Sequence, residues 1–539
     1  MGITGTKLEK KIFKAGLFVG IAHLLFKLAG LIQARFMTQY LPQETYDVLN
    51  VFAFENVIFT LFLIGEEALA PAFLPLFMKE MDEHREREGW SFANTVLSSQ
   101  FLLLSALALF LFFAPQWVVS VCTAWEDAPE KFALSVRSIK TLAPAVIGLS
   151  LGSTTYVLLN AHKRFFLAAF GDAVWKFCAV AFLLVGVVFK LNCAELLMWG
   201  LVAGSVCKLL THLFGLRDKL SNFRFEFNFR HPAFKKLLWL MVPLLVGILV
   251  AKFRDLINNT TVLSRIEESG LMQANSIGRK LQGTIHWLVP YTLSIAVFPF
   301  FCELVDKKDH HELGRLVTHF GRILMAAFIP FAMLIAVVSV PFTALLFQGG
   351  YFNEEAVRRT ALTLSFYTFV LPAGAVEALT MQAFFAHRRM WTVTLAGIFF
   401  SSLSIFISWV GLRVAGDNGM IMLCFIAGGF TLSRILKSVA LTLFLRKNAP
   451  VFPFLETFNF LSRVILASVA AAAISWFLLG RLSGVEQLSG RFGDLVKLAV
   501  TGGFFTLFYL GAAYLMRIAE IHELYQLIIT QLAKFRKKG

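Results

Sequence analysis

The sequence predicts an all-α polytopic membrane protein with about 14 transmembrane helices, arranged as two parallel six-helix lobes plus two additional helices. The 539-residue chain is 57% hydrophobic and has a mean hydropathy of +0.70, values that place most of it in lipid. Apolar runs of about 20 residues, the length that crosses a bilayer as a helix, recur throughout the chain. Two short segments also repeat at nearly one spacing, which indicates two related halves.

Counting the apolar runs in order gives fourteen predicted spans. They lie near 15–41, 48–78, 92–122, 133–160, 166–190, 194–216, 234–263, 271–301, 316–347, 359–385, 391–414, 418–446, 458–480 and 494–516.

Lys and Arg collect in alternate connections between these spans, for example at 79–87, 161–164, 217–236 and 307–315. The other connections, such as PQETYD and TAWEDAPEKF, are short and neutral or acidic. This is the positive-inside pattern, and it predicts that both termini are cytoplasmic and that the number of spans is even. The net charge of +16 therefore marks membrane topology and not a nucleic-acid surface. We interpret the basic N-terminus as a retained cytoplasmic end, because no small-residue cleavage site follows it.

The internal repeat defines the predicted lobes. AFLPLFMKEMDE at 72–83 matches AVFPFFCELVDK at 296–307, and AHKRFFLAAFGD at 161–172 matches AHRRMWTVTLAG at 386–397. The interval spans six helices, and an even number preserves orientation, so parallel repeats are expected. The predicted division is an N-terminal lobe at 1–216, a cytoplasmic strap at 217–238, a C-terminal lobe at 239–446, helices 13–14 at 447–516 and a basic amphipathic cytoplasmic tail at 517–539.

Several ionisable residues interrupt the apolar runs. Glu55 and Glu66 lie eleven residues apart, which would place them on one face of an α-helix. Charges at membrane depth cost at least ~2.5–3.5 kcal/mol each, so such a face suits a watery cavity better than lipid. Arg254 and Arg279 begin polar stripes in the second half, although such stripes can also be contacts between helices.

No motif points to an enzyme. The sequence contains no phosphate-binding Walker loop, no H-E-x-x-H and no paired Cys/His spacing, so we expect neither catalysis nor a metal or other cofactor. The six cysteines are scattered, mostly within apolar segments, and are expected to be free thiols.

Several short motifs resemble those of the MurJ (MviN-like) lipid II flippases, a family of the multidrug/oligosaccharidyl-lipid/polysaccharide exporter superfamily. GEEALAPAFLP at 65–75 is similar to the family's A-E-G-A-F-S-Q-A-F-V-P, and TLSIAVFPFF, LFQGGYF and FFAHRRMWTV support it. The resemblance implies a cationic cavity between two lobes that holds a diphosphate-linked substrate. Lys27 stands at the family's first helix-1 arginine, Asp47 at its aspartate before helix 2, and Arg279 at its helix-8 arginine.

The chain departs from the family at two places. Gln33 replaces the second helix-1 arginine, and Phe59, Thr60 and Leu61 occupy the region of the helix-2 arginines. We expect Lys252 and Arg254 to supply the missing charge. The expected substrate-binding residues are thus Lys27, Lys252, Arg254 and Arg279, and the acidic or gating residues are Asp47, Glu55 and Glu66.

The resemblance implies a flippase that moves a polyprenyl-diphosphate-linked cell-wall precursor, with lipid II favoured, from the inner to the outer leaflet by alternating access. The alternatives are export of another lipid-linked saccharide, multidrug–cation antiport, and a membrane scaffold that transports nothing. The expected location is the bacterial inner membrane. Expected partners are the lipid-linked saccharide and membrane lipids, with cell-wall synthesis or division proteins as further candidates, no nucleic acid, and a monomeric state.

Overall fold

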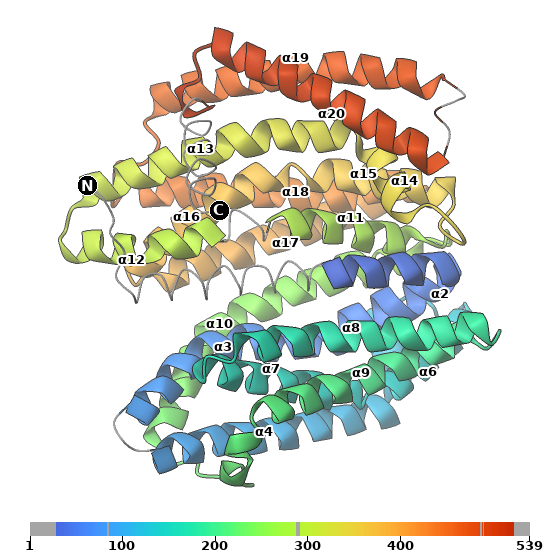
Figure 1. The fold of residues 1–539 in the computed structure, drawn as a ribbon, viewed down its shortest axis with the longest axis vertical. Helices are drawn as coiled ribbons and strands as arrows, with labels where there is room; N and C mark the ends of the chain where they lie inside the picture. Colours follow the sequence, from blue (N-terminus) through green and yellow to red (C-terminus); the bar gives the residue numbers. More distant parts are fainter. Residues whose placement is uncertain (1–27, 83–85, 287–291, 486–487, 489, 522–539) are drawn as a thin grey trace, which may run out of the picture. The chain divides into compact units, whose positions relative to one another are not determined.

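The computed structural model describes residues 28–82, 86–286, 292–485, 488 and 490–521. These residues form helices joined by short connections, and no β-strand occurs among them (Figure 1), so the predicted fold class is confirmed. The predicted tail beyond residue 521 and the first half of the first predicted span lie outside the described residues.

Within the described residues, eleven helices are long and apolar enough to cross a membrane. The number is twelve if Pro129–Leu142 and Ala145–Ala161, which meet at 45°, form one broken span. The predicted spans at 15–41 and 271–301 both run over residues outside the description. The predicted total of fourteen is therefore not confirmed.

By internal contacts the chain divides into two compact units, residues 1–272 and 273–539. Unit 1 contains a helix at 28–40, and then α2 (Gln43–Thr45), η1 (Tyr46–Ile58), α3 (Phe59–Asp82), α4 (Glu86–Phe113), α5 (Pro115–Cys122), α6 (Pro129–Leu142), α7 (Ala145–Ala161), α8 (Phe165–Val188), α9 (Cys193–Gly215), η2 (Arg217–Asn222), α10 (Pro232–Leu256), η3 (Ile257–Thr261) and η4 (Leu263–Arg265). α11 (Leu271–His286) begins at the boundary.

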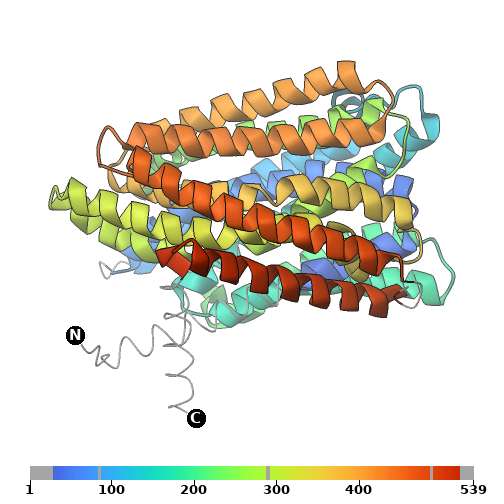
Figure 2. The same cartoon turned by 90° about the horizontal axis from the view of Figure 1, so that it is seen from above.

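Unit 2 continues with α12 (Thr292–Asp306), α13 (His310–Val337), α14 (Ser339–Phe347), α15 (Glu354–Tyr367), α16 (Val370–Ala386), α17 (Met390–Ala415), α18 (Gly419–Leu445), α19 (Phe454–Ser483) and α20 (Gly490–Leu515). α16 packs on α13 and α18, and α19 packs on α13 and runs beside α20, at the red end of the colour scale (Figure 2).

The order of helices repeats at the interval found in the sequence. α4 begins at Glu86 and α13 at His310, 224 residues later, while α7 begins at Ala145 and α16 at Val370, 225 residues later. The turn after each of these last two helices holds one residue with positive φ, Lys163 at 60° and Arg388 at 57°. L-residues rarely adopt this conformation, so its recurrence supports a duplicated unit.

Helix α10 packs on α3 and belongs to unit 1, whereas the sequence-based division starts the C-terminal lobe at residue 239. That division stays a prediction.

The connection before α10 is held to the start of α8 by Arg164, whose guanidinium donates to both carboxylate oxygens of Asp218 at 2.5 and 2.7 Å. These hydrogen bonds lower the pKa of Asp218 to about 2.

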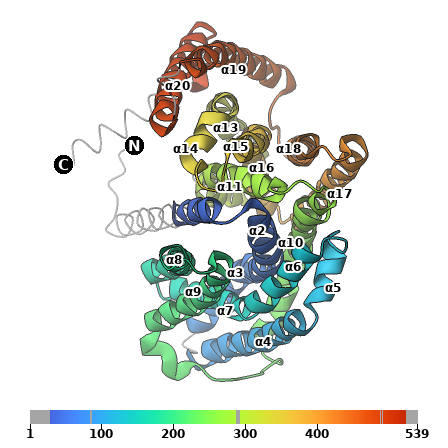
Figure 3. The ribbon, with the colours of Figure 1, turned by 90° about the vertical axis from the view of Figure 1, so that its right-hand side faces the viewer.

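Helices α7, α8 and α9 of unit 1 pack closely because glycines replace side chains where they touch (Figure 3). A Cβ on Gly204 would lie 2.6 Å from the carbonyl oxygen of Trp175. A Cβ on Gly171 would lie 2.2 Å from Nε2 of His212, a fully buried ring. This ring lies within hydrogen-bond distance of the Gly152 and Ala168 carbonyl oxygens, at 2.9 and 3.1 Å.

Replacing Gly171 by alanine should therefore destabilise unit 1, because an added methyl must displace the buried His212 ring. Overpacking of this kind costs about 1–3 kcal/mol. Gly502→Ala in α20 is the matched control, since no described atom beyond the neighbouring backbone of α20 lies within 4 Å of the position that a Cβ would take there. We expect a lower thermal midpoint for Gly171→Ala in detergent and an unchanged or slightly higher one for Gly502→Ala. Equal midpoints for the two variants would contradict the packing argument.

Candidate functional site

The predicted acidic residues Asp47 and Glu55 both lie in η1, a π-helix of thirteen residues. Two side-chain hydrogen bonds within η1 join residues that are five positions apart. Asn50 donates to Glu55 at 3.1 Å, and Asn56 donates to the Val51 carbonyl oxygen at 2.7 Å. A π-helix holds more residues per turn than an α-helix. The α-helical register that would align Glu55 with Glu66 is therefore wrong across residues 46–58.

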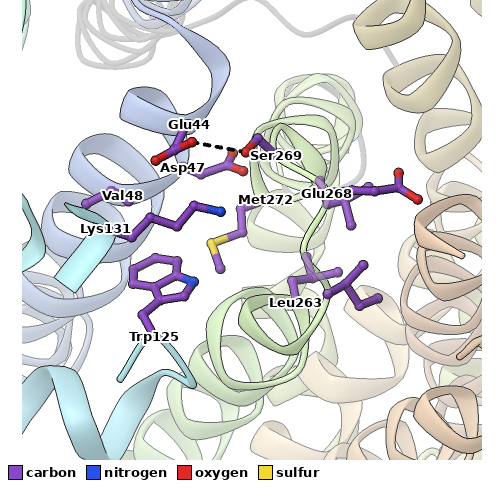
Figure 4. Close-up of a pocket in the computed structure, with 11 residues that line it drawn as sticks. Glu44, Asp47, Val48, Trp125, Lys131, Leu263, Glu268, Ser269 and Met272 are labelled. Carbon is purple, nitrogen blue, oxygen red and sulfur yellow. Dashed lines mark hydrogen bonds between the residues drawn. The ribbon is translucent and has the colours of Figure 1, made fainter. Parts of the chain in front are cut away.

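Asp47 anchors the loop that follows η4. Its Oδ2 accepts a hydrogen bond from the Gly270 backbone N–H at 2.7 Å, and Ser269 donates to Glu44 at 3.4 Å (Figure 4). Gly270 has a φ of +88°, and a Cβ there would lie 2.1 Å from Oε1 of Gln43. Asp47 thus pairs with a backbone donor that only glycine can present in this loop.

The pocket at Asp47 is small. Its cavity volume of about 10 Å³ corresponds to about one water molecule. Lys131 and Trp125 contribute to its wall, with the Lys131 amine directed into it (Figure 4). A diphosphate-linked headgroup does not fit this volume, so the pocket is a close contact between η1 and the loop.

The two predicted cations of α10 have carboxylate partners. Lys252 donates to Glu67 of α3 at 3.1 Å, and Arg254 donates to its neighbour Asp255 through Nε at 2.9 Å and Nη2 at 2.7 Å. The polar stripe expected after Arg254 does not continue as one α-helical face, because η3 is a π-helix and η4 a 3₁₀-helix. Arg254 is buried, whereas Arg265 is exposed.

In unit 2, Arg279 lies in α11 and packs on α18. Its guanidinium carbon lies 4.7 Å from the centre of the Phe430 ring, and the side chain is half-buried. An arginine over an aromatic face is a stabilising cation–π arrangement. Among the other expected residues, Lys27 lies outside the described residues, as does the side chain of Glu66 in α3.

The structure shows a charge cluster that sequence reasoning missed in unit 2. Oε1 of Glu377 in α16 accepts from Lys437 at 2.9 Å and from Arg434 at 3.1 Å, both on α18. The Glu377 side chain is only 4% exposed. His286 of α11 reaches the same helix as Glu377, since a Cβ on Gly374 would lie 2.6 Å from its ring.

A second missed pair lies in unit 1, where Lys208 of α9 contacts Asp172 of α8 at 2.6 Å. The Lys208 ammonium also lies 4.6 Å from the Phe62 ring centre. Lys208 and Asp172 are each a charged residue within an apolar run, which is the feature that also singled out Glu55 in the sequence. That signal could have found them individually, but their pairing across helices is not readable from the sequence.

Comparison with known proteins agrees with this architecture. Residues 17–484 match the family model described as lipid II flippase MurJ. A lipid II flippase MurJ of Burkholderia cenocepacia is 24% identical over 474 residues, which cover 86% of this chain and 89% of that protein. A probable lipid II flippase MurJ of Rhizobium meliloti is 26% identical over 390 residues, or 70% of this chain and 72% of that protein.

Two solved structures have the same fold. A lipid II flippase MurJ in an inward closed conformation has a TM-score of 0.71 at 17% identity, over 93% of this chain and 99% of that chain. An inward-facing MATE family multidrug resistance transporter of the MOP superfamily has a TM-score of 0.63 at 12% identity, over 78% and 94% of the two chains. Since the family model spans most of the sequence, the chain belongs to the lipid II flippase MurJ family.

Proposed function

We propose that this protein is a flippase that moves lipid II, a polyprenyl-diphosphate-linked cell-wall precursor, from the inner to the outer leaflet by alternating access. The observation that carries the proposal is the family match over residues 17–484. The similarity to a MATE transporter concerns the fold alone, so drug export is not favoured over lipid II. No catalytic step is required, because the cargo changes sides and not covalent structure.

The cargo combines a polyprenyl tail, which belongs in lipid, with an anionic diphosphate, which needs cations and water. We propose that Lys27, Lys252, Arg254 and Arg279 bind the diphosphate and that Asp47, Glu55 and Glu66 pair with these cations or gate access. Lys252 and Arg254 already contact carboxylates, so the diphosphate would replace those partners. Arginine can bind phosphate oxygens bidentately, and lysine cannot.

The membrane potential supports the proposed direction. An inside-negative potential favours outward movement of an anion by ~2.3 kcal/mol per elementary charge per 100 mV. We further propose that the protein acts as a monomer in the bacterial inner membrane with both termini cytoplasmic, an orientation supported by the basic connections.

The direct functional test is rescue of bacterial cells depleted of their own lipid II flippase. Expression of this chain should restore growth and cell shape. A normally inserted and abundant protein that fails to restore growth would contradict the proposed cargo and favour another lipid-linked saccharide.

Arg279 provides the sharpest test among the proposed cations. Arg279→Ala should abolish rescue while protein abundance stays normal, and Arg279→Lys should retain only part of the activity. Loss of a charge-assisted hydrogen bond costs about 1.5–3 kcal/mol, or roughly tenfold to a hundredfold in cargo affinity. Lys27→Arg should cost less than Arg279→Lys, since it preserves charge and adds bidentate capacity. If Arg279→Ala lowers the thermal midpoint and leaves transport per folded molecule unchanged, Arg279 only stabilises α11 against Phe430.

A further inference from the structure

The buried charges of the two units are balanced differently. In unit 1, Asp172 of α8 contacts one lysine, Lys208, and their side chains are 13% and 1% exposed. In unit 2, the single carboxylate of Glu377 contacts both Lys437 and Arg434. α9 and α18 occupy corresponding places in the repeat, since each follows an asparagine cap, Asn192 or Asn418, 226 residues apart. The cluster in unit 2 therefore carries one cation more than its carboxylate requires.

The two cations at Glu377 are not equivalent. Lys437 is the more enclosed, with 11% of its side chain exposed and its Nζ 3.6 Å from the Cβ position of Gly397 in α17. Arg434 is 28% exposed. Within the described part of the chain, Nε of Arg434 and Oε2 of Glu377 are buried without a hydrogen-bond partner. Arg434 thus has unused donor capacity, and Lys437 is the more enclosed partner of the carboxylate.

Arg434 shares a face of α18 with the residue that packs on Arg279. Phe430 and Arg434 are four residues apart, so their side chains neighbour each other on the helix surface. The Arg279 guanidinium lies over the Phe430 ring, and His286, two turns farther along α11, reaches Gly374 of α16. One turn of α18 therefore carries both the aromatic ring that packs on Arg279 and a second guanidinium, Arg434, which contacts Glu377 of α16.

We propose that Arg434 is a second guanidinium that binds the diphosphate of the cargo, exchanging Glu377 for a phosphate oxygen while Lys437 keeps Glu377 paired. This inference rests on the proposed function and extends it to a residue on α18. A carboxylate left alone in a buried site is strongly unfavourable, and a second cation removes that penalty. The exchange is available in unit 2 but not at Asp172, where removing Lys208 would leave the carboxylate without its ion-pair partner.

The test measures binding of purified lipid II to the full-length protein in detergent, together with the thermal midpoint of each variant. Arg434→Gln should weaken lipid II binding by about tenfold to a hundredfold and leave the midpoint nearly unchanged. Arg434→Lys keeps the charge but not the bidentate geometry, so it should weaken binding less than Arg434→Gln. Lys437→Gln should instead lower the midpoint, because it removes the more enclosed cation and leaves the buried Glu377 with only the more exposed Arg434.

Two further variants serve as controls. Arg315→Gln removes the same charge from an exposed pair with Glu312 in α13 and should change neither binding nor midpoint. Lys208→Gln removes the one-to-one partner in unit 1 and should lower the midpoint, as Lys437→Gln does. If Arg434→Gln lowers the midpoint as much as Lys437→Gln and binds lipid II as tightly as the unmodified protein, the inference is overturned.

Inorganic pyrophosphate separates this inference from the proposed cargo. Unmodified protein that binds lipid II while Arg434→Gln binds it equally well would overturn the role of Arg434 and leave the proposed function intact. Protein that does not bind lipid II but binds pyrophosphate in an Arg434-dependent manner would support the anion site and overturn the cargo. Binding of neither probe would overturn both.

Discussion

Pairing of buried charges is the constraint on which this structure depends. A charge inside a bilayer is costly, and a buried charge that loses its partner is destabilising by about 3–5 kcal/mol. Asp172–Lys208 joins α8 to α9, and Glu377 joins α16 to two cations of α18. Close helix packing makes these contacts possible. The Lys208 side chain lies against Gly152, where an added Cβ would be 2.8 Å from Cε of Lys208. In our proposal, stability and cargo binding therefore draw on the same small set of ionisable side chains.

The repeated helices hold buried charges in two different arrangements. Both units place a lysine on corresponding helices, α9 and α18, against a buried carboxylate. In unit 1 one lysine contacts one carboxylate, and the His212 ring lies on neighbouring α8 and α7 backbone. In unit 2 an additional arginine shares the carboxylate, and Arg279 packs on Phe430, one helical turn from Arg434 along α18. In our proposal, unit 1 keeps its buried pair for stability, and unit 2 releases one cation for an anionic ligand.

Much of the fold was predictable because hydropathy, loop charge and the repeat can be read from the sequence without knowing which helices touch. The site was predictable only in part. The sequence indicated Asp47 but not its hydrogen bond to Gly270, which joins residues 223 positions apart. An assumed α-helical register failed at Glu55 because η1 is a π-helix, a rare form that hydropathy does not distinguish. Glu377 and Arg434 were missed because their ion pair joins two helices, and the sequence does not show which helices are in contact.

Movement of lipid II across a bilayer by this chain is measured most directly with the purified protein in liposomes. Lipid II is placed in both leaflets, and a membrane-impermeant reagent that modifies its headgroup is added outside. We expect proteoliposomes to expose the inner-leaflet pool over time, whereas protein-free liposomes expose only the outer-leaflet pool. Modification confined to the outer-leaflet pool, with folded protein present and a membrane potential imposed in either direction, would contradict lipid II flipping by this protein.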